Sequence, residues 1–209
     1  MPMPEPGRTL LICCGAIARE IVALVGENGW DHMDVQCLPA RLHNTPKAIP
    51  EAIRDKIQTA RDSYDKIFVL YGDCGTGGRL DAMLREEDVE RVFGNHCYEV
   101  FAGSEELAQL MAAEPGTFFL TDFLARHFER LVIGGLGLDR YPGLRDRYFG
   151  RYRKLAYLAQ SHDPEIEARA RRAARRLGLA FEMRYTGYGG YEGFLAARAA
   201  CPKPAARKA

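Results

Sequence analysis

The stretch KIFVLYGDCGTGG, from Lys66 to Gly78, decides the fold class. Its first six residues, Lys66–Tyr71, form an apolar run as long as a buried strand, and a glycine-rich loop follows at once. Apolar runs at Thr9–Cys14 and Lys154–Gln160 likewise lead into segments with helical periodicity. Strands that alternate with helices of this kind favour a mostly parallel sheet with helices on both faces. We therefore predict an α/β fold with a doubly wound, mostly parallel, Rossmann-like sheet.

The same alternation of apolar and amphipathic segments predicts the other elements. Further strands are expected at Met33–Leu38, Val89–Phe93, Cys97–Val100 and Leu179–Tyr185. Helices are expected at Ala16–Glu27, Ile49–Tyr64, Ser104–Ala113, Phe118–Arg130, Pro164–Leu177 (capped by Asp163) and Tyr191–Ala200, and Val132–Tyr152 is expected to be irregular. We predict a single domain over residues 8–200, with flexible termini at 1–7 and 201–209.

Charge and cysteine content exclude several classes of protein. The sequence has 29 basic and 28 acidic residues, a formal charge of +1, so it has no general attraction to nucleic acid or to an anionic membrane. No apolar run approaches the roughly 18 residues that span a bilayer. The six cysteines form no CxxC pair, which argues against a zinc ribbon or a thioredoxin. We expect a cytoplasmic protein with free thiols and with neither nucleic acid nor membrane as a partner.

Three cysteines occupy positions that suit a binding site. Cys14 ends one predicted strand, Cys74 lies in the loop after another, and each stands beside a glycine. Ligands of open parallel sheets bind beyond the carboxyl ends of the strands, so a 2-1-3 strand order would bring both thiols to one crevice. Cys97 and its neighbour His96 add a third thiol and an imidazole. We predict that Cys14, Cys74, His96 and Cys97 bind zinc or an iron–sulfur cluster, with the choice between them open.

Simple burial is the alternative for every cysteine, because free cysteine often packs as a small apolar side chain. For Cys14, Cys74 and Cys97 the two interpretations carry about equal weight. For Cys13, Cys37 and Cys201, whose positions suggest no shared site, burial is the main expectation.

Neighbouring residues supply the other candidates. The predicted catalytic residues are Asp73, Cys74, His96 and Glu99, and the predicted substrate-binding residues are Gly75, Thr76, Gly77, Gly78, Arg140 and Tyr141. The glycine loop could offer backbone N–H groups to an anion, although it matches neither a P-loop nor GxGxxG. Asp73 could instead stabilise the turn. Arg140 and Tyr141 belong to an Arg- and Tyr-rich stretch that could clamp an anionic or planar substrate, or form a solvated loop.

Six motifs carry a family resemblance. They are LICCGAIAREI (11–21), YGDCGTGG (71–78), HCYEVFAG (96–103), GTFFLTDFL (116–124), GLGLDRYPGLRDRYFG (135–150) and YTGYGGYE (185–192). Together they resemble the domain of unknown function 1638 family over roughly residues 10–195. The resemblance implies no defined activity. It implies an association with corrinoid-dependent methyl-transfer proteins, and it puts the four predicted metal ligands inside family motifs.

The leading hypothesis is a small metalloenzyme that uses a zinc or iron–sulfur centre on a small molecule, with methyl- or sulfur-group transfer as candidate reactions. One alternative is an accessory protein that binds a metal or a corrinoid for a methyltransferase. Another is a metal-free enzyme with Cys74 as its nucleophile. A Ser–His–Asp hydrolase has no support, because the sequence lacks a GxSxG elbow.

Overall fold

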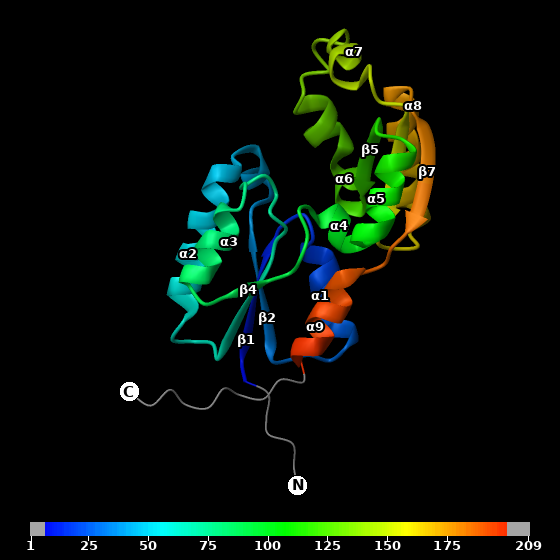
Figure 1. Ribbon diagram of the computed structural model, residues 1–209. Helices are drawn as coiled ribbons and strands as arrows, with labels where there is room; N and C mark the ends of the chain where they lie inside the picture. Colours follow the sequence, from blue (N-terminus) through cyan, green and yellow to red (C-terminus); the bar gives the residue numbers. More distant parts are fainter. Residues whose placement is uncertain (1–6, 200–209) are drawn as a thin grey trace. The chain divides into compact units, whose positions relative to one another are not determined.

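The computed structural model describes residues 7–199, drawn in colour in Figure 1. Predictions for residues 1–6 and 200–209, including the one for Cys201, lie outside this range. We expected one domain over residues 8–200, and the described chain divides into two compact units. Unit 1 contains the described residues up to Val100 and from Tyr188 onward, and unit 2 is Phe101–Gly187. Each unit is described by itself.

Unit 1 is built on a four-stranded parallel sheet in the order β2-β1-β3-β4. Its strands are β1 (Thr9–Cys14), β2 (Met33–Leu38), β3 (Lys66–Leu70) and β4 (Glu90–Arg91). All six residues of β1 are buried, as expected for the central strand of a parallel sheet. The structure confirms that the first and third strands are neighbours, so the loops after them leave the same edge of the sheet.

The helices of unit 1 follow the apolar periodicity of the sequence. They are α1 (Ala18–Glu27), α2 (Ile49–Ala60), α3 (Arg79–Glu86), α4 (Cys97–Ala102) and α9 (Gly190–Ala199), with short 3-10 helices η1 (Ala40–Asn44) and η2 (Pro46–Ala48). In α2 the isoleucines at 49, 53 and 57 are fully buried, which places one apolar stripe in the core.

The strand predicted at Cys97–Val100 is wrong, because this segment starts α4. The backbone N–H groups of Glu99 and Val100 donate to the His96 carbonyl, as in the first turn of a helix. The Glu99 carboxylate also accepts a hydrogen bond from the Asn95 N–H at 2.7 Å. A short-range hydrogen bond of this kind stabilises a helix start over a strand.

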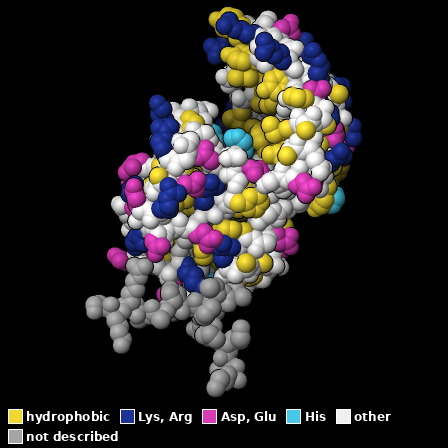
Figure 2. All heavy atoms as spheres, in the orientation of Figure 1, with side chains coloured by type: hydrophobic (Ala, Val, Ile, Leu, Met, Phe, Trp, Pro, Cys, Tyr) yellow, Lys and Arg dark blue, Asp and Glu magenta, His cyan; other side chains and the backbone are white. Residues whose placement is uncertain are grey.

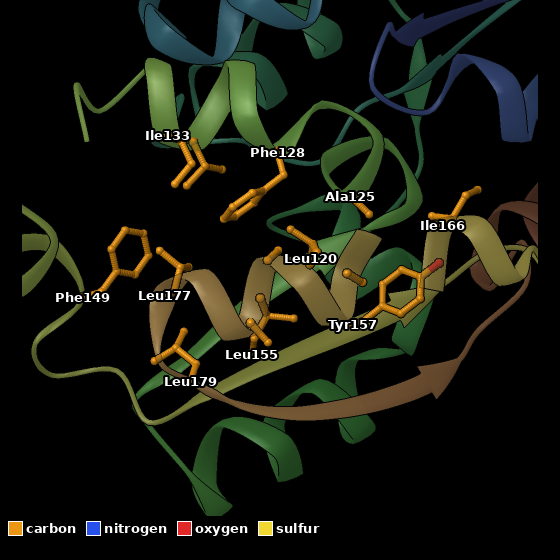
Figure 3. Packing of buried hydrophobic residues seen from close by; sticks show 14 of the residues in the cluster. Leu120, Ala125, Phe128, Ile133, Phe149, Leu155, Tyr157, Ile166, Leu177 and Leu179 are labelled. Atoms are coloured by element: carbon orange, nitrogen blue, oxygen red, sulfur yellow. The ribbon is translucent and has the colours of Figure 1, made fainter. Parts of the chain in front are cut away.

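Unit 2 has its own parallel sheet, in the order β5-β6-β7. The strands are β5 (Thr117–Thr121), β6 (Lys154–Ala159) and β7 (Ala180–Tyr185), and the helices are α5 (Ser104–Ala113), α6 (Asp122–Phe128), α7 (Leu144–Phe149) and α8 (Pro164–Leu177), with a π-helical turn, η3 (Glu129–Gly134). Figure 3 shows the core that these elements share, in which Leu120, Tyr157, Ile166 and Leu177 are buried, with Leu177 near Phe149.

The helix predicted at Phe118–Arg130 is a strand followed by a helix. Residues 117–121 pair with β6, and the Thr121 hydroxyl then accepts a hydrogen bond from the Leu124 N–H and caps α6. The run is apolar throughout, so its hydrophobicity fits a buried strand as well as a buried helix. By contrast, α8 has the predicted bounds and the predicted cap, because the Asp163 carboxylate accepts from the N–H groups of Glu165 and Ile166.

The predicted α/β class is confirmed, with parallel strands that form two separate sheets in place of one. Within residues 7–199, no helix has the length and apolar character that a bilayer crossing requires. Figure 2 shows basic and acidic side chains interspersed over the surface around α2 and α3, where Arg54 pairs with Glu86 and Glu87.

Candidate functional site

Three thiols of unit 1 gather beyond the carboxyl ends of its strands. Cys14 is the last residue of β1, Cys74 lies in the loop after β3, and Cys97 begins α4 after β4. Burial raises the pKa of each thiol, and charge on the neighbouring thiols raises the pKa of Cys74 and of Cys97 further. The pKa of Cys74 rises to about 12. Charge on Cys14 contributes to the raised pKa of Cys74, and charge on Cys74 and Cys14 contributes to the raised pKa of Cys97.

The loop after β3 is fixed against the segment that precedes α4. The Asp73 N–H donates to the Gly94 carbonyl at 3.1 Å, and the Cys74 N–H donates to the Asn95 carbonyl at 2.7 Å. Gly72 makes this approach possible, since a Cβ atom there would lie 2.9 Å from the backbone nitrogen of His96. Cys74 itself has φ of 49°, in the left-handed region that non-glycine residues rarely adopt. These contacts bring Cys74 towards Cys97.

Asp73 organises the glycine-rich loop. Its carboxylate accepts hydrogen bonds from the Thr76 hydroxyl at 2.6 Å and from the N–H groups of Gly77 and Gly78 at 3.0 and 2.8 Å. Burial opposes ionisation, yet these hydrogen bonds hold the pKa of Asp73 below its ordinary value. An external anion could use the Gly77 and Gly78 amides only by displacing the Asp73 carboxylate. The predicted binding role of residues 75–78 therefore stays a prediction.

Glu99 and His96 make contacts with residues other than the three thiols. The Glu99 carboxylate caps the segment before α4 through the Asn95 N–H, and the His96 side chain is exposed beside Tyr98. Catalytic roles for Asp73, His96 and Glu99 stay predictions. Arg140 and Tyr141 are exposed residues of unit 2, and the Arg140 backbone N–H donates to Asp139.

His43 is the imidazole that the structure places beside a thiol. Its Nδ1 atom lies 3.8 Å from the Cys14 sulfur and 3.0 Å from the Ala40 carbonyl oxygen. Its ring stacks on Tyr71, with centroids 6.2 Å apart. No partner for His43 could be predicted from the sequence, because η1 meets Cys14 only after β2 pairs with β1. The available signal was that η1 follows the carboxyl end of a parallel strand.

Backbone amides point at all three sulfurs. The Ala16 N–H donates to Cys14 Sγ at 3.3 Å. A hydrogen bond from the Gly72 N–H lowers the pKa of the Cys74 thiol. A hydrogen bond from the Tyr98 N–H lowers the pKa of the Cys97 thiol in the same way. These amides favour the thiolate form, whereas burial opposes it and dominates.

The Tyr71 hydroxyl is a further polar group beside the Cys14 thiol. Tyr71 is only 1% exposed, and its hydroxyl lies near the Cys14 thiol without completing a hydrogen bond of ordinary geometry to any described residue. A buried hydroxyl in this state is uncommon and calls for a partner. Burial raises the pKa of Tyr71, so the hydroxyl is neutral at physiological pH.

The structure thus places Cys14, Cys74 and Cys97 at or beyond the carboxyl ends of the unit 1 strands, with His43 beside Cys14 and the His96 side chain exposed. The metal-binding roles of Cys14, Cys74, His96 and Cys97 stay predictions. As the side chains stand, no group of three or more His, Cys, Asp or Glu residues in the described part of the chain is arranged to hold a metal ion. Side-chain rotation would be needed to converge the sulfurs on one point.

Comparison with known proteins gives one match. The model of a family described as "Protein of unknown function (DUF1638)" matches residues 37–195. The match includes Cys74 and Cys97 and begins after Cys14, whereas the motif resemblance ran from about residue 10. No curated protein and no solved structure matches the chain.

Proposed function

Because the chain belongs to the DUF1638 family, whose description assigns no chemistry, we propose its function from the site alone: unit 1 binds a thiophilic metal centre through Cys14, Cys74 and Cys97 and uses it on a small molecule. Cysteine sulfur is the donor that zinc and iron–sulfur clusters prefer in proteins. The proposal keeps the three predicted thiols and takes His43 as the neighbouring imidazole.

One observation carries the proposal. Three thiols from separate strand ends share one largely buried region, each sulfur faces a backbone amide, and the buried Tyr71 hydroxyl beside them lacks a complete hydrogen bond. A core that needed only small apolar side chains would need none of these polar groups. Amide hydrogen bonds to sulfur are a known device for tuning metal–thiolate centres.

The raised pKa values favour a metal over a free nucleophile. With a pKa of about 12, the Cys74 thiol stays protonated near neutral pH, which argues against the metal-free mechanism. A bound cation would reverse this, because a coordinating thiol is deprotonated outright. The positive charge would offset the burial of the thiolates.

His43 suits a role at such a centre. When Nδ1 donates its proton to the Ala40 carbonyl, the lone pair is on Nε2, the tautomer that a metal-ligating histidine usually adopts. Cys14, Cys74 and Cys97 would hold the metal through their sulfur atoms after side-chain rotation. When bound, the metal would supply Lewis-acid activation of a thiol or water, which suits methyl- or sulfur-group transfer. The five free cysteines of the described chain support a cytoplasmic location as part of the proposal.

Metal analysis of anaerobically purified protein tests the proposal. We expect close to one metal centre per chain, together with loss of that metal in the C74S and C97S variants and its retention in C37S. Visible absorption and acid-labile sulfide would identify an iron–sulfur cluster, and zinc without absorption would identify a mononuclear site.

A cobalt titration of the wild-type chain tests the same proposal without relying on variants that could fold poorly. Co²⁺ added to the wild-type chain is expected to give sulfur-to-cobalt charge-transfer absorption whose intensity counts the thiolate ligands. Wild-type protein that holds less than about 0.2 equivalents of metal after reconstitution with zinc or with iron and sulfide, and shows no cobalt–thiolate band, would overturn the proposal.

A further inference from the structure

A second pair of thiols lies on β1 and β2. Cys13 and Cys37 are register partners in this parallel pair, and their sulfur atoms are 3.2 Å apart. Both cysteines are free. Successive side chains of a strand point to opposite faces of a sheet, so Cys13 faces away from Cys14 and from the three-thiol site.

The two thiols differ in their access to solvent. Cys13 is fully buried on the central strand, whereas Cys37 is exposed on β2, which is an edge strand of this sheet. A hydrogen bond from the Cys13 thiol lowers the pKa of Cys37, and the charge of Lys56 on α2 contributes to the same shift. An exposed, readily ionised thiol with a buried thiol behind it is the arrangement of an attacking and a resolving cysteine.

The backbone already has the spacing that a disulfide needs. Neighbouring strands lie about 4.8 Å apart. Disulfide-bonded cysteines have Cα atoms roughly 4.4–6.8 Å apart. The sulfur atoms need to move from 3.2 Å to about 2.05 Å, a shift of side chains alone.

We propose that Cys13 and Cys37 form a redox-active dithiol that exchanges with low-molecular-weight disulfides. The Cys37 thiolate attacks one sulfur of the small disulfide, the S–S bond breaks, and the first small thiolate leaves and takes up a proton. Cys13 then attacks the Cys37 sulfur of the mixed disulfide and breaks the bond to the second small sulfur. That small thiolate leaves and takes up the proton that Cys13 gives up. The protein dithiol is oxidised by two electrons, and the small disulfide is reduced to two thiols.

This inference is independent of the metal proposal, because it uses neither Cys74 nor Cys97. Thiol–disulfide exchange runs in both directions, so an excess of small thiol returns the pair to the dithiol. A small disulfide is the expected reaction partner because Cys37 is exposed and a molecule in solution can reach its sulfur.

Peptide mass mapping of the full chain after equilibration with glutathione buffers tests the proposal. In wild-type protein, we expect glutathione disulfide to link the peptide 9–19 to the peptide 20–41, and reduced glutathione to reverse the link. Because 9–19 contains both Cys13 and Cys14, the C14S variant is the matched control, and it should keep the link.

The C13S variant should stop at the mixed disulfide, with one glutathione on Cys37, and C37S should give neither product. Wild-type protein that accumulates the Cys37 adduct without a link, or that links Cys37 to Cys14 in place of Cys13, would overturn the proposal. So would a Cys37 that iodoacetamide labels freely in wild-type protein but that glutathione disulfide leaves unmodified.

Discussion

The Nδ1 atom of His43 lies 3.8 Å from the sulfur of Cys14. The two residues are 29 positions apart in the chain and meet only because the loops after β1 and β2 leave the same edge of the sheet. The contact makes His43 a neighbour of the candidate site, whereas the His96 side chain is exposed.

Replacing His43 therefore distinguishes the two histidines. We expect H43A to lower metal affinity by about 10- to 100-fold, the usual effect of removing a group that supports a metal ligand. H96A serves as the matched control and should change affinity less than about twofold. Competition with a chromophoric chelator measures both, and equal losses in the two variants would contradict the assignment.

The Y71F variant tests the buried hydroxyl. An unsatisfied buried polar group costs about 1–3 kcal/mol, so its removal should leave the apo protein as stable or more stable in urea denaturation. If the hydroxyl serves the bound centre, the same variant should bind metal more weakly. Destabilisation of the apo protein by more than about 1 kcal/mol would mean that the hydroxyl has a structural partner.

The D73N variant should destabilise the apo protein by about 1–3 kcal/mol near pH 7, since it weakens three hydrogen bonds to a carboxylate. The pKa of Asp73 is lower in the folded than in the unfolded state. Its contribution is therefore complete above the unfolded value of about 3.9 and disappears as the pH falls through the folded value. Urea denaturation of both proteins at neutral and at acidic pH should show the difference shrinking in acid.

The G72A variant tests the close approach of the loop that carries Cys74. The new Cβ atom would lie 2.9 Å from the His96 nitrogen and 3.0 Å from the Asn95 carbonyl carbon, both rigid backbone atoms. We expect a loss of about 2–4 kcal/mol in urea denaturation and a displaced Cys74 with weaker metal binding. G26A is the control, because its Cβ would meet no atom within 4 Å, and alanine in α1 should add about 0.5–1 kcal/mol.

In unit 2, Asp122 is a buried carboxylate on which three hydrogen bonds converge. It is 1% exposed and accepts hydrogen bonds from the Tyr157 and Ser161 hydroxyls and from the Gln160 N–H. D122A leaves buried donors unpaired, so we expect a loss of about 3 kcal/mol, and S161A should cost about 1 kcal/mol. Hydrogen exchange in β5 and β6 measures both, and equal protection in the two variants would contradict this role.

Positions at strand ends were the most reliable guide to the site. Cys14 and Cys74 could be placed together from the sequence because each follows an apolar run, and parallel strands bring their carboxyl ends to one edge. Likewise, α8 could be predicted with its bounds because Asp163, Pro164 and Gly178 mark its ends and its apolar stripe is regular.

Strand pairing and hydrogen bonds in the folded chain determine the features that the sequence did not predict. Alternating strands and helices look the same whether they build one sheet or two, so the division between β4 and β5 left no mark in the hydrophobic pattern. The start of α4 depends on the hydrogen bond between Glu99 and Asn95, and the place of His43 depends on the pairing of β2 with β1. Such choices are made by contacts that periodicity does not encode.

Cys13 and Cys14 share a single peptide bond, and their side chains face opposite sides of the sheet. Because β1 is hydrogen-bonded along both of its edges, the link between them has little freedom to twist. A covalent change that moves one of these residues therefore acts on the other across a single peptide unit, without passing through packed side chains.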